Sequence, residues 1–188
     1  VVWHNRSQRL NHENGPGSTP IVWKDLLIFH CDGSDVQYVV ALDVSTGEEV
    51  WRTDRSGEMN DNPEMKKAYG TPLVTSVGGR EVLLSPAANW LYGYDTKTGE
   101  ELWKVNYGIL GFSIVSRPVV ADEVVYFSTS FMKTELLAVQ LGPKVNTTPE
   151  ILWRYRRSVP RMPSPVLVDD SVYLFGDKGI ATCLDRHT

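Results

Sequence analysis

Short apolar stretches of strand-like residues recur along the whole chain, separated by turns of polar residues and glycine. In each repeat a proline precedes a short apolar run, a tight turn and a second apolar run rich in β-branched and aromatic residues. Two such runs joined by a tight turn are typical of a β-hairpin on a pleated, half-buried surface. The second runs are Leu26–Phe29, Val82–Leu84, Val124–Phe127 and Val172–Phe175.

A third and a fourth strand complete each repeat. The third strands are predicted at Val39–Asp43, Leu91–Asp95, Leu136–Gln140 and Ile180–Asp185. The fourth strands carry tryptophans that recur at spacings of 48, 52 and 50 residues, namely Trp3, Trp51, Trp103 and Trp153. The prolines keep similar spacings of 52, 46 and 47 residues, at Pro20, Pro72, Pro118 and Pro165. Two independent markers with nearly the same period indicate an internal repeat.

Four-stranded antiparallel units that recur every 40 to 50 residues or so, about the length of one blade, are typical of a β-propeller. The sequence therefore predicts an all-β fold, a single propeller segment over residues 1–188. The strongest helix signal is about two turns at Pro63–Tyr69, in a connector. The predicted units are a blade end at 1–16, blades at 17–60, 70–108 and 116–157, and an incomplete blade at 164–188.

We expect the chain to begin with the last strand of one blade at Trp3 and to end with the first three strands of another. Because a whole propeller has about 4 to 8 blades, these roughly four blades predict part of a ring of about seven or eight. The alternative is a closed ring of four blades, in which Val1–Trp3 supplies the fourth strand of the last blade.

The turns between third and fourth strands share a motif of a small residue, Asp, Thr-Gly and Trp at fixed spacing. Its residues are Ala41, Asp43, Gly47 and Trp51, then Gly93, Asp95, Gly99 and Trp103, and later Trp153 and Asp185. In the third repeat Gln140 replaces the Asp, and Trp153 follows it by 13 residues instead of 8. We therefore expect a longer turn there, containing Lys144–Pro149, and weaker docking of Trp153.

The motif resembles the tryptophan-docking repeat of the pyrroloquinoline-quinone-like propellers, over nearly the whole chain. Independently of that resemblance, Asp can accept backbone N–H groups in an Asx-type turn, and Gly supplies the positive φ that closes it. In the family the indole packs between the small residue and the glycine peptide of a neighbouring blade, so Ala41, Gly93, Ala138 and Cys183 are expected to face a ring. The tryptophans are accordingly interpreted as structural.

Composition and charge narrow the function. The chain is 41% hydrophobic and 22% charged, with a formal net charge of −4, which is an ordinary globular composition and argues against a nucleic-acid groove or a polybasic membrane surface. The longest apolar runs are far shorter than the roughly 20 residues of a membrane helix. Cys31 and Cys183 have no zinc-site spacing, and we expect them to stay unpaired on distant strands. The sequence has no phosphate-binding loop, dinucleotide fingerprint or nucleophile elbow.

A basic and aromatic set of loop residues is predicted at one end of the propeller, where the connectors before each first strand and the loops between second and third strands emerge. Loop residues carry function more often than core residues do, although exposed Arg and Trp are also ordinary solvent-facing groups. The candidate binding face comprises Asn89, Trp90, Arg117, Met132, Lys133 and Arg161, with Arg9, His12, Phe112, Phe131 and Met162 around it.

The resemblance implies a non-catalytic scaffold that binds protein partners in the bacterial cell envelope, similar to the propeller lipoprotein of outer-membrane protein assembly. It implies a periplasmic or other extracytoplasmic location, no membrane span, no nucleic acid and no cofactor. The alternative is a fragment of a quinoprotein dehydrogenase that uses pyrroloquinoline quinone with calcium. We assign no catalytic or metal-binding residue, and a third possibility is a polysaccharide-binding propeller, which rests on Trp90 and the surface aromatics.

Overall fold

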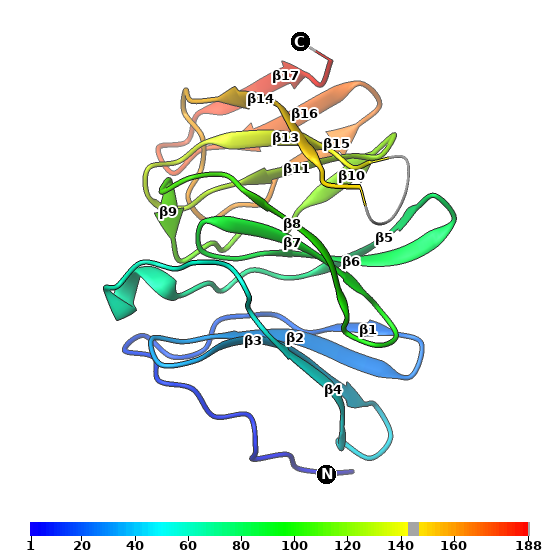
Figure 1. The fold of residues 1–188 in the computed structure, drawn as a ribbon. Coiled ribbons are helices and arrows are strands. Elements are labelled where there is room, and N and C mark those ends of the chain that lie inside the picture. Colours follow the sequence, from blue (N-terminus) through cyan, green and yellow to red (C-terminus); the bar gives the residue numbers. More distant parts are fainter. Residues whose placement is uncertain (143–146, 188) are drawn as a thin grey trace.

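The computed structural model describes residues 1–142 and 147–187 as four stacked antiparallel sheets (Figure 1). The strand order in each sheet follows the chain, so each sheet is one blade. Blade I contains β1 (Ile21–Trp23), β2 (Leu26–Asp32), β3 (Gln37–Asp43) and β4 (Glu49–Asp54). Blade II contains β5 (Leu73–Val77), β6 (Arg80–Pro86), β7 (Trp90–Asp95) and β8 (Glu101–Asn106). Blade III contains β10 (Val119–Ala121), β11 (Val124–Ser128), β13 (Leu136–Gln140) and β14 (Glu150–Tyr155), and blade IV contains β15 (Val166–Val168), β16 (Ser171–Phe175) and β17 (Ala181–Asp185). The predicted propeller architecture is confirmed.

Two small elements lie outside the four blades; their residues belong to the connectors between blades and, for β12, to the loop between β11 and β13. A two-stranded ribbon pairs β9 (Gly111–Phe112) with β12 (Phe131–Met132), and the sequence pattern does not predict it. The helix expected at Pro63–Tyr69 is a single 3₁₀ turn, η1 (Pro63–Lys66), whose cap Asn62 accepts a hydrogen bond from the Glu64 N–H at 3.0 Å. It ends early because the following residues are extended, with the Tyr69 N–H donating to the Ile114 carbonyl at 2.7 Å.

The hairpin turns between first and second strands use left-handed backbone conformations. Lys24 has φ of 52° in blade I, and Asp122 and Asp169 have φ of 47° and 52° in blades III and IV. In blade II a Gly78-Gly79 pair occupies the turn. Tight hairpins favour such conformations because their twist matches that of the flanking strands.

The motif aspartates close the turns between third and fourth strands as Asx turns. The Asp43 carboxylate accepts hydrogen bonds from the backbone N–H groups of Ser45 and Thr46, both at 2.8 Å, and Asp95 repeats this geometry in blade II. Hydrogen bonds from Ser45 and then Thr46 lower the pKa of Asp43. Gly47 and Gly99 both have φ of 74°, a conformation that favours glycine.

Tryptophans of the fourth-strand position lie against the motif glycine of the next blade. A Cβ atom built on Gly99 would stand 2.4 Å from Cε3 of Trp51, and one built on Gly47 would stand 2.4 Å from Cε3 of Trp3. Two residues beyond each tryptophan a side chain donates to that glycine's carbonyl: Thr53 Oγ1 to Gly99 at 2.6 Å and Asn5 Nδ2 to Gly47 at 2.7 Å. The dock thus combines indole packing with a hydrogen bond to the same peptide.

The small motif residues face a tryptophan within their own blade. Ala41 pairs with Trp51 and Gly93 with Trp103 across the sheet, and a Cβ on Gly93 would stand 2.2 Å from the Trp103 ring. Trp153 is half-buried and packs at 5.8 Å, between ring centroids, from Tyr126. Residues 144–146 of the longer turn expected at Lys144–Pro149 lie outside the described residues.

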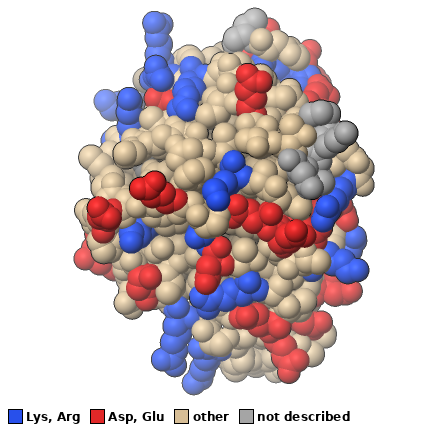
Figure 2. Space-filling view, in the orientation of Figure 1, with Lys and Arg blue, Asp and Glu red and all other residues tan. Residues whose placement is uncertain are grey.

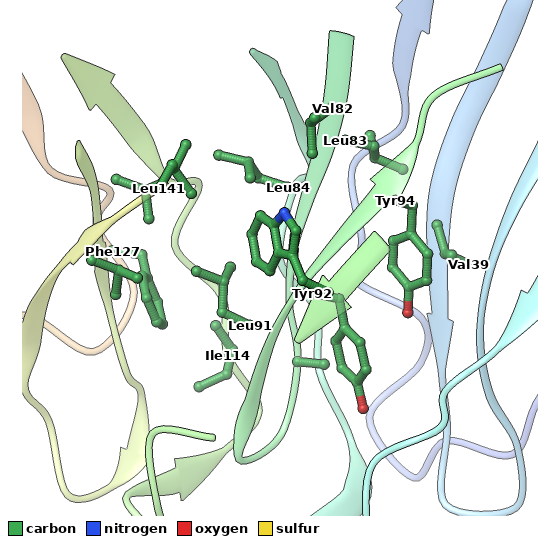
Figure 3. Close-up of a cluster of buried hydrophobic side chains, with 14 of the residues drawn as sticks. Val39, Val82, Leu83, Leu84, Leu91, Tyr92, Tyr94, Ile114, Phe127 and Leu141 are labelled. Carbon is green, nitrogen blue, oxygen red and sulfur yellow. The ribbon is translucent and has the colours of Figure 1, made fainter. Parts of the chain in front are cut away.

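The main core lies between blades I, II and III. In Figure 3, Val39 of blade I lies beside Tyr94 of blade II, and Phe127 of blade III lies with Leu91 and Leu141 on the other side of blade II. Buried tyrosines of β7 extend this core, with the rings of Tyr92 and Tyr94 stacked 5.6 Å apart. A second, smaller cluster joins blade III to blade IV through residues that include Tyr126, Leu136 and Leu174.

The first residues differ from the expectation. In the described chain no strand precedes Ile21, and Trp3 instead anchors an irregular segment by donating from Nε1 to the Val44 carbonyl at 2.9 Å. Blade IV has three strands, none of them paired with residues 1–3, and the two termini lie at opposite ends of the stack (Figure 1). The four-blade ring closed by Val1–Trp3 is therefore not what the structure shows.

Candidate functional site: the connector face

One side of the stack, formed by the edges of all four blades, carries the connectors between blades and the loops between second and third strands, and we call it the connector face. It lies on the left of Figure 1, where η1 and β9 project. The connectors bond to one another rather than only to their own blades. The Ser113 N–H donates to the Lys67 carbonyl at 2.6 Å, and the Lys133 N–H donates to the Leu110 carbonyl at 3.1 Å. This bonding joins segments from successive blades into one surface.

A hollow of about 580 Å³ opens among these connectors, and we call it the central hollow. Its apolar wall comes from three connectors and the β9–β12 ribbon, with Tyr69, Phe112, Phe131 and Met162. The Phe112 and Phe131 rings pack edge to face at 5.5 Å between centroids. Phe131 and Met162 are 48% and 64% exposed, so the hollow presents apolar surface to solvent.

Two cations stand in the hollow in different states. Lys67 is buried and bonds to the Glu64 carboxylate; burial works against its charge, but Glu64 and the nearby Tyr69 raise the pKa of Lys67 overall. Arg161 is exposed, with its guanidinium 5.3 Å from the centre of the Phe131 ring. Within the described residues this guanidinium has no ion pair or hydrogen bond. Lys67 is therefore paired inside the protein, whereas the Arg161 guanidinium is exposed and can bind a ligand.

A second charged cluster lies beside the hollow on blade III. Glu135 is fully buried and accepts hydrogen bonds from Arg156 at 2.8 Å and Arg154 at 3.3 Å, with Lys133 Nζ 3.9 Å away. Arg156 and Lys133 are 63% and 67% exposed. One carboxylate thus holds three cations, which leaves the cluster net positive. In Figure 2 Lys and Arg gather at the upper left, around the connectors of the last two blades.

A buried polar network lies beneath the connector face, between blades I and II. Arg55 forms a bidentate pair with Asp32, at 2.7 and 3.0 Å, and both side chains are fully buried. Arg55 also donates to Ser85 Oγ at 2.6 Å, and Ser85 Oγ lies 2.9 Å from His30 Nε2. The rings of Tyr92 and Tyr94 cover the guanidinium at 4.9 and 5.9 Å.

Burial sets the ionisation of this network. It raises the pKa of Asp32, and the adjacent Arg55 guanidinium opposes that rise. Burial and then the charge of Arg55 lower the pKa of His30 well below its usual value, so this imidazole is neutral. The side chains of this network are buried, and Arg55 holds the start of the 55–72 connector, so we interpret the network as structural.

Comparison with known proteins decides the family. The family model of the outer membrane protein assembly factor BamB matches residues 1–142 and 35–188, which together span the chain. The chain belongs to the BamB family.

Individual BamB proteins resemble the chain in sequence and in fold. BamB of Shewanella oneidensis is 32% identical over 124 residues, covering 65% of this chain and 29% of that protein. The crystal structure of BamB from Moraxella catarrhalis superposes with a TM-score of 0.62 at 18% identity, covering 89% of this chain and 47% of that one. The chain thus spans less than half the length of these BamB proteins.

A quinohemoprotein alcohol dehydrogenase from Comamonas testosteroni also superposes, with a TM-score of 0.51 at 22% identity, over 78% of this chain and 21% of that enzyme. At this identity the likeness shows the fold alone. Residues 1–142 and 147–187 contain no group of three or more His, Cys, Asp and Glu placed to hold a metal ion. Over the same residues, no helix is both long and apolar enough to cross a membrane.

The candidate face residues do not all meet in this BamB-family chain. Trp90 and Asn89 lie in a separate polar hollow with Glu58 and Asp61 of the 55–72 connector. The Trp90 Nε1 donates to the Glu58 carbonyl at 2.9 Å, and a Cβ on Gly57 would stand 2.6 Å from the indole. The connector therefore covers this ring, which is half-buried and already packed.

The other candidates divide between three places. Arg117 lies two residues before β10 and lines a groove between the first strands of blades II, III and IV. Met132 and Lys133 lie on and after the β9–β12 ribbon, Met132 being 66% exposed. Arg161 alone of the six lines the central hollow. The sequence places all six residues in one basic and aromatic set, whereas Arg117 and Arg161 line different hollows in the structure.

Sequence reasoning did not single out the buried residues of this face. Asp32 ends β2, Arg55 follows β4 and Glu135 precedes β13, and none of the three belongs to the repeated motif. The signal that could have found them is a charged residue at the end of an apolar strand, as Asp32 follows Cys31 in β2, because such a charge is seldom buried without a partner. Nothing in the sequence marks Tyr69 as a residue of the hollow, because the connectors between blades do not repeat.

Proposed function

We propose that this chain is part of a non-catalytic propeller that assists outer membrane protein assembly outside the cytoplasm, and that it binds protein partners through the connector face. Membership in the BamB family supports the general role. The observation that supports the surface is an exposed apolar ribbon and hollow, with Phe131, Met132 and Met162, beside a net positive cluster.

Such a surface has the character of a protein interface. Aromatic residues, Met and Arg are enriched at interface centres, and Trp, Tyr and Arg contribute most of the binding energy. The opposite side of the stack, which we call the turn face, carries the short Asx turns instead. There the polar groups of Asp43 and Asp95 are occupied by their own backbone.

Site-specific photo-crosslinking tests this proposal. A photoreactive residue replaces Met132 on the connector face or, as the control, exposed Lys97 on the turn face, and each protein is illuminated in a bacterial envelope extract. We expect the Met132 position to give adducts that contain outer membrane assembly proteins, identified by mass spectrometry, and the Lys97 position to give few. Equal labelling from both positions, or adducts without assembly proteins, would count against the proposal.

A further inference from the structure

The geometry points to a peptide-binding site in the central hollow: we propose that it binds an extended segment of a partner protein in which a carboxylate is flanked by large apolar side chains. This rests on the proposed function, because it names the chemistry of the partner at the same face. The carboxylate is assigned to Arg161 and the apolar side chains to the two hollows that flank it.

The space on each side of Arg161 supports an extended ligand. Arg161 and Asp177 line both the central hollow and a neighbouring groove of about 520 Å³. The groove has its own apolar wall at Val159 and Ile180, the latter 47% exposed. Ligand pockets usually enclose about 300 to 1,000 Å³. Two hollows of that size on either side of one cation fit a segment that crosses the cation better than a single compact ligand.

Among residues 1–142 and 147–187 nothing bonds to the Arg161 guanidinium, whereas its backbone is held in place. The Ser130 hydroxyl donates to the Arg161 carbonyl at 2.8 Å, and the Arg161 N–H lies 3.3 Å from the Asp177 carboxylate. The Phe131 ring supports the guanidinium from one side. A planar guanidinium held in this way can bind a carboxylate through two parallel hydrogen bonds. Because the Phe131 ring already restricts the Arg161 side chain, less conformational entropy is lost when a ligand binds.

Charge around the site favours a discrete carboxylate over a polyanion. Arg157 and Lys178 are exposed beside the groove, and the Glu135 cluster adds positive charge. On the other side of the face, however, Glu58 and Asp61 line the polar hollow near Trp90. A long polyanion crossing the whole face would meet these carboxylates. A short segment at Arg161 would instead meet Asp177, which accepts from the Arg161 N–H at 3.3 Å, and Glu64, which is paired with Lys67.

Fluorescence anisotropy with labelled peptides tests the assignment. The probe is Ser-Phe-Asp-Leu-Ser, and the comparison peptides are Ser-Phe-Asn-Leu-Ser, without the carboxylate, and Ser-Ala-Asp-Ala-Ser, without the apolar side chains. The variant is Arg161→Gln, and its matched control is Arg157→Gln, which removes the same charge from an exposed position of the same face that lines neither hollow. Urea unfolding of each variant verifies the fold.

We expect the probe to bind the wild-type protein saturably. Its affinity should fall about tenfold in Arg161→Gln but less than about twofold in Arg157→Gln. Each comparison peptide should bind the wild-type protein about tenfold more weakly than the probe does. If Arg161→Gln does not fold, Met162→Ala, at a 64% exposed side chain, provides the test with the same expectation. Equal losses for the two arginine variants would overturn the proposal as non-specific charge attraction, and so would the absence of saturable binding. Photo-crosslinking at Met132 to assembly proteins together with such a failure would overturn only the peptide chemistry and leave the proposed function intact.

Discussion

Trp51 of blade I lies against Gly99 of blade II, so closely that a Cβ atom on this glycine would stand 2.4 Å from the indole. The contact repeats at Trp3 and Gly47 with the same distance and the same backbone φ. The Trp51 contact joins two neighbouring blades, and the Trp3 contact joins the first residues of the chain to blade I. The motif glycine thus has two functions: it closes its own turn and receives an indole from the preceding part of the chain.

Replacing Gly99 by Ala tests this double function. The control is Gly79→Ala, because Gly79 has a similar φ of 79° but a Cβ there would meet no atom within 4 Å. Both variants pay for a left-handed alanine, roughly 1–2 kcal/mol, and Gly99→Ala should lose about 1–3 kcal/mol more through the clash with Trp51. Urea unfolding measures the difference, and equal losses would show that the indole contact contributes nothing.

The buried pair of Asp32 and Arg55 should be sensitive to the loss of one partner. Asp32→Asn leaves the guanidinium buried without a counter-charge, and we expect a loss of about 3–5 kcal/mol. The control is Asp54→Asn, which breaks the exposed pair with Arg52, at 3.2 Å, and should change stability by less than about 1 kcal/mol. The double variant Asp32→Leu/Arg55→Met should recover much of the loss, and a double variant no more stable than Asp32→Asn would contradict this account.

His30 should make the protein less stable in mild acid. Its pKa is lowered in the folded state, so the unfolded chain takes up a proton first as the pH falls below the usual value of 6.5. Stability is therefore fully present above that pH and declines below it, by at most about 1.4 kcal/mol per pH unit. The free energy of unfolding, measured at pH 7.5 and about 5.5, should fall less for His30→Gln than for the wild type. The exposed-site variant His4→Gln should retain the wild-type dependence, and an unchanged slope in His30→Gln would assign the effect elsewhere.

The two cysteines should differ in reactivity. Cys183 is exposed and Cys31 is buried, both as free thiols, and burial raises the pKa of Cys31 to about 11. A thiol reagent at neutral pH should therefore modify one thiol in the folded protein and the second only after unfolding, because the thiolate is the reactive form. Cys183→Ser should abolish the fast reaction. A protein in which neither thiol reacts, even unfolded, would contain a disulfide and contradict the blade arrangement.

The repeat made much of the fold predictable. Strands follow from local alternation and from turn residues, and the spacing of the tryptophans and prolines gave the blade period without any long-range information. The candidate face was less predictable because its connectors differ in length and carry no period. Trp90 illustrates this: its position in a loop suggests exposure, but Gly57, more than thirty residues earlier in the chain, allows the preceding connector to cover the ring.

The amino-acid sequence by itself determined the all-β blades, the Asx turns of Asp43 and Asp95, and the resemblance to quinone-like propellers, since all of these depend on residues near one another in the chain. Only the tertiary structure decided which blade receives each indole, that Asp32, Arg55, Ser85 and His30 form one buried network, and that Arg161 and Arg117 lie in different hollows. These features depend on how separate blades and connectors pack, and packing brings together residues whose sequence separation has no local signature.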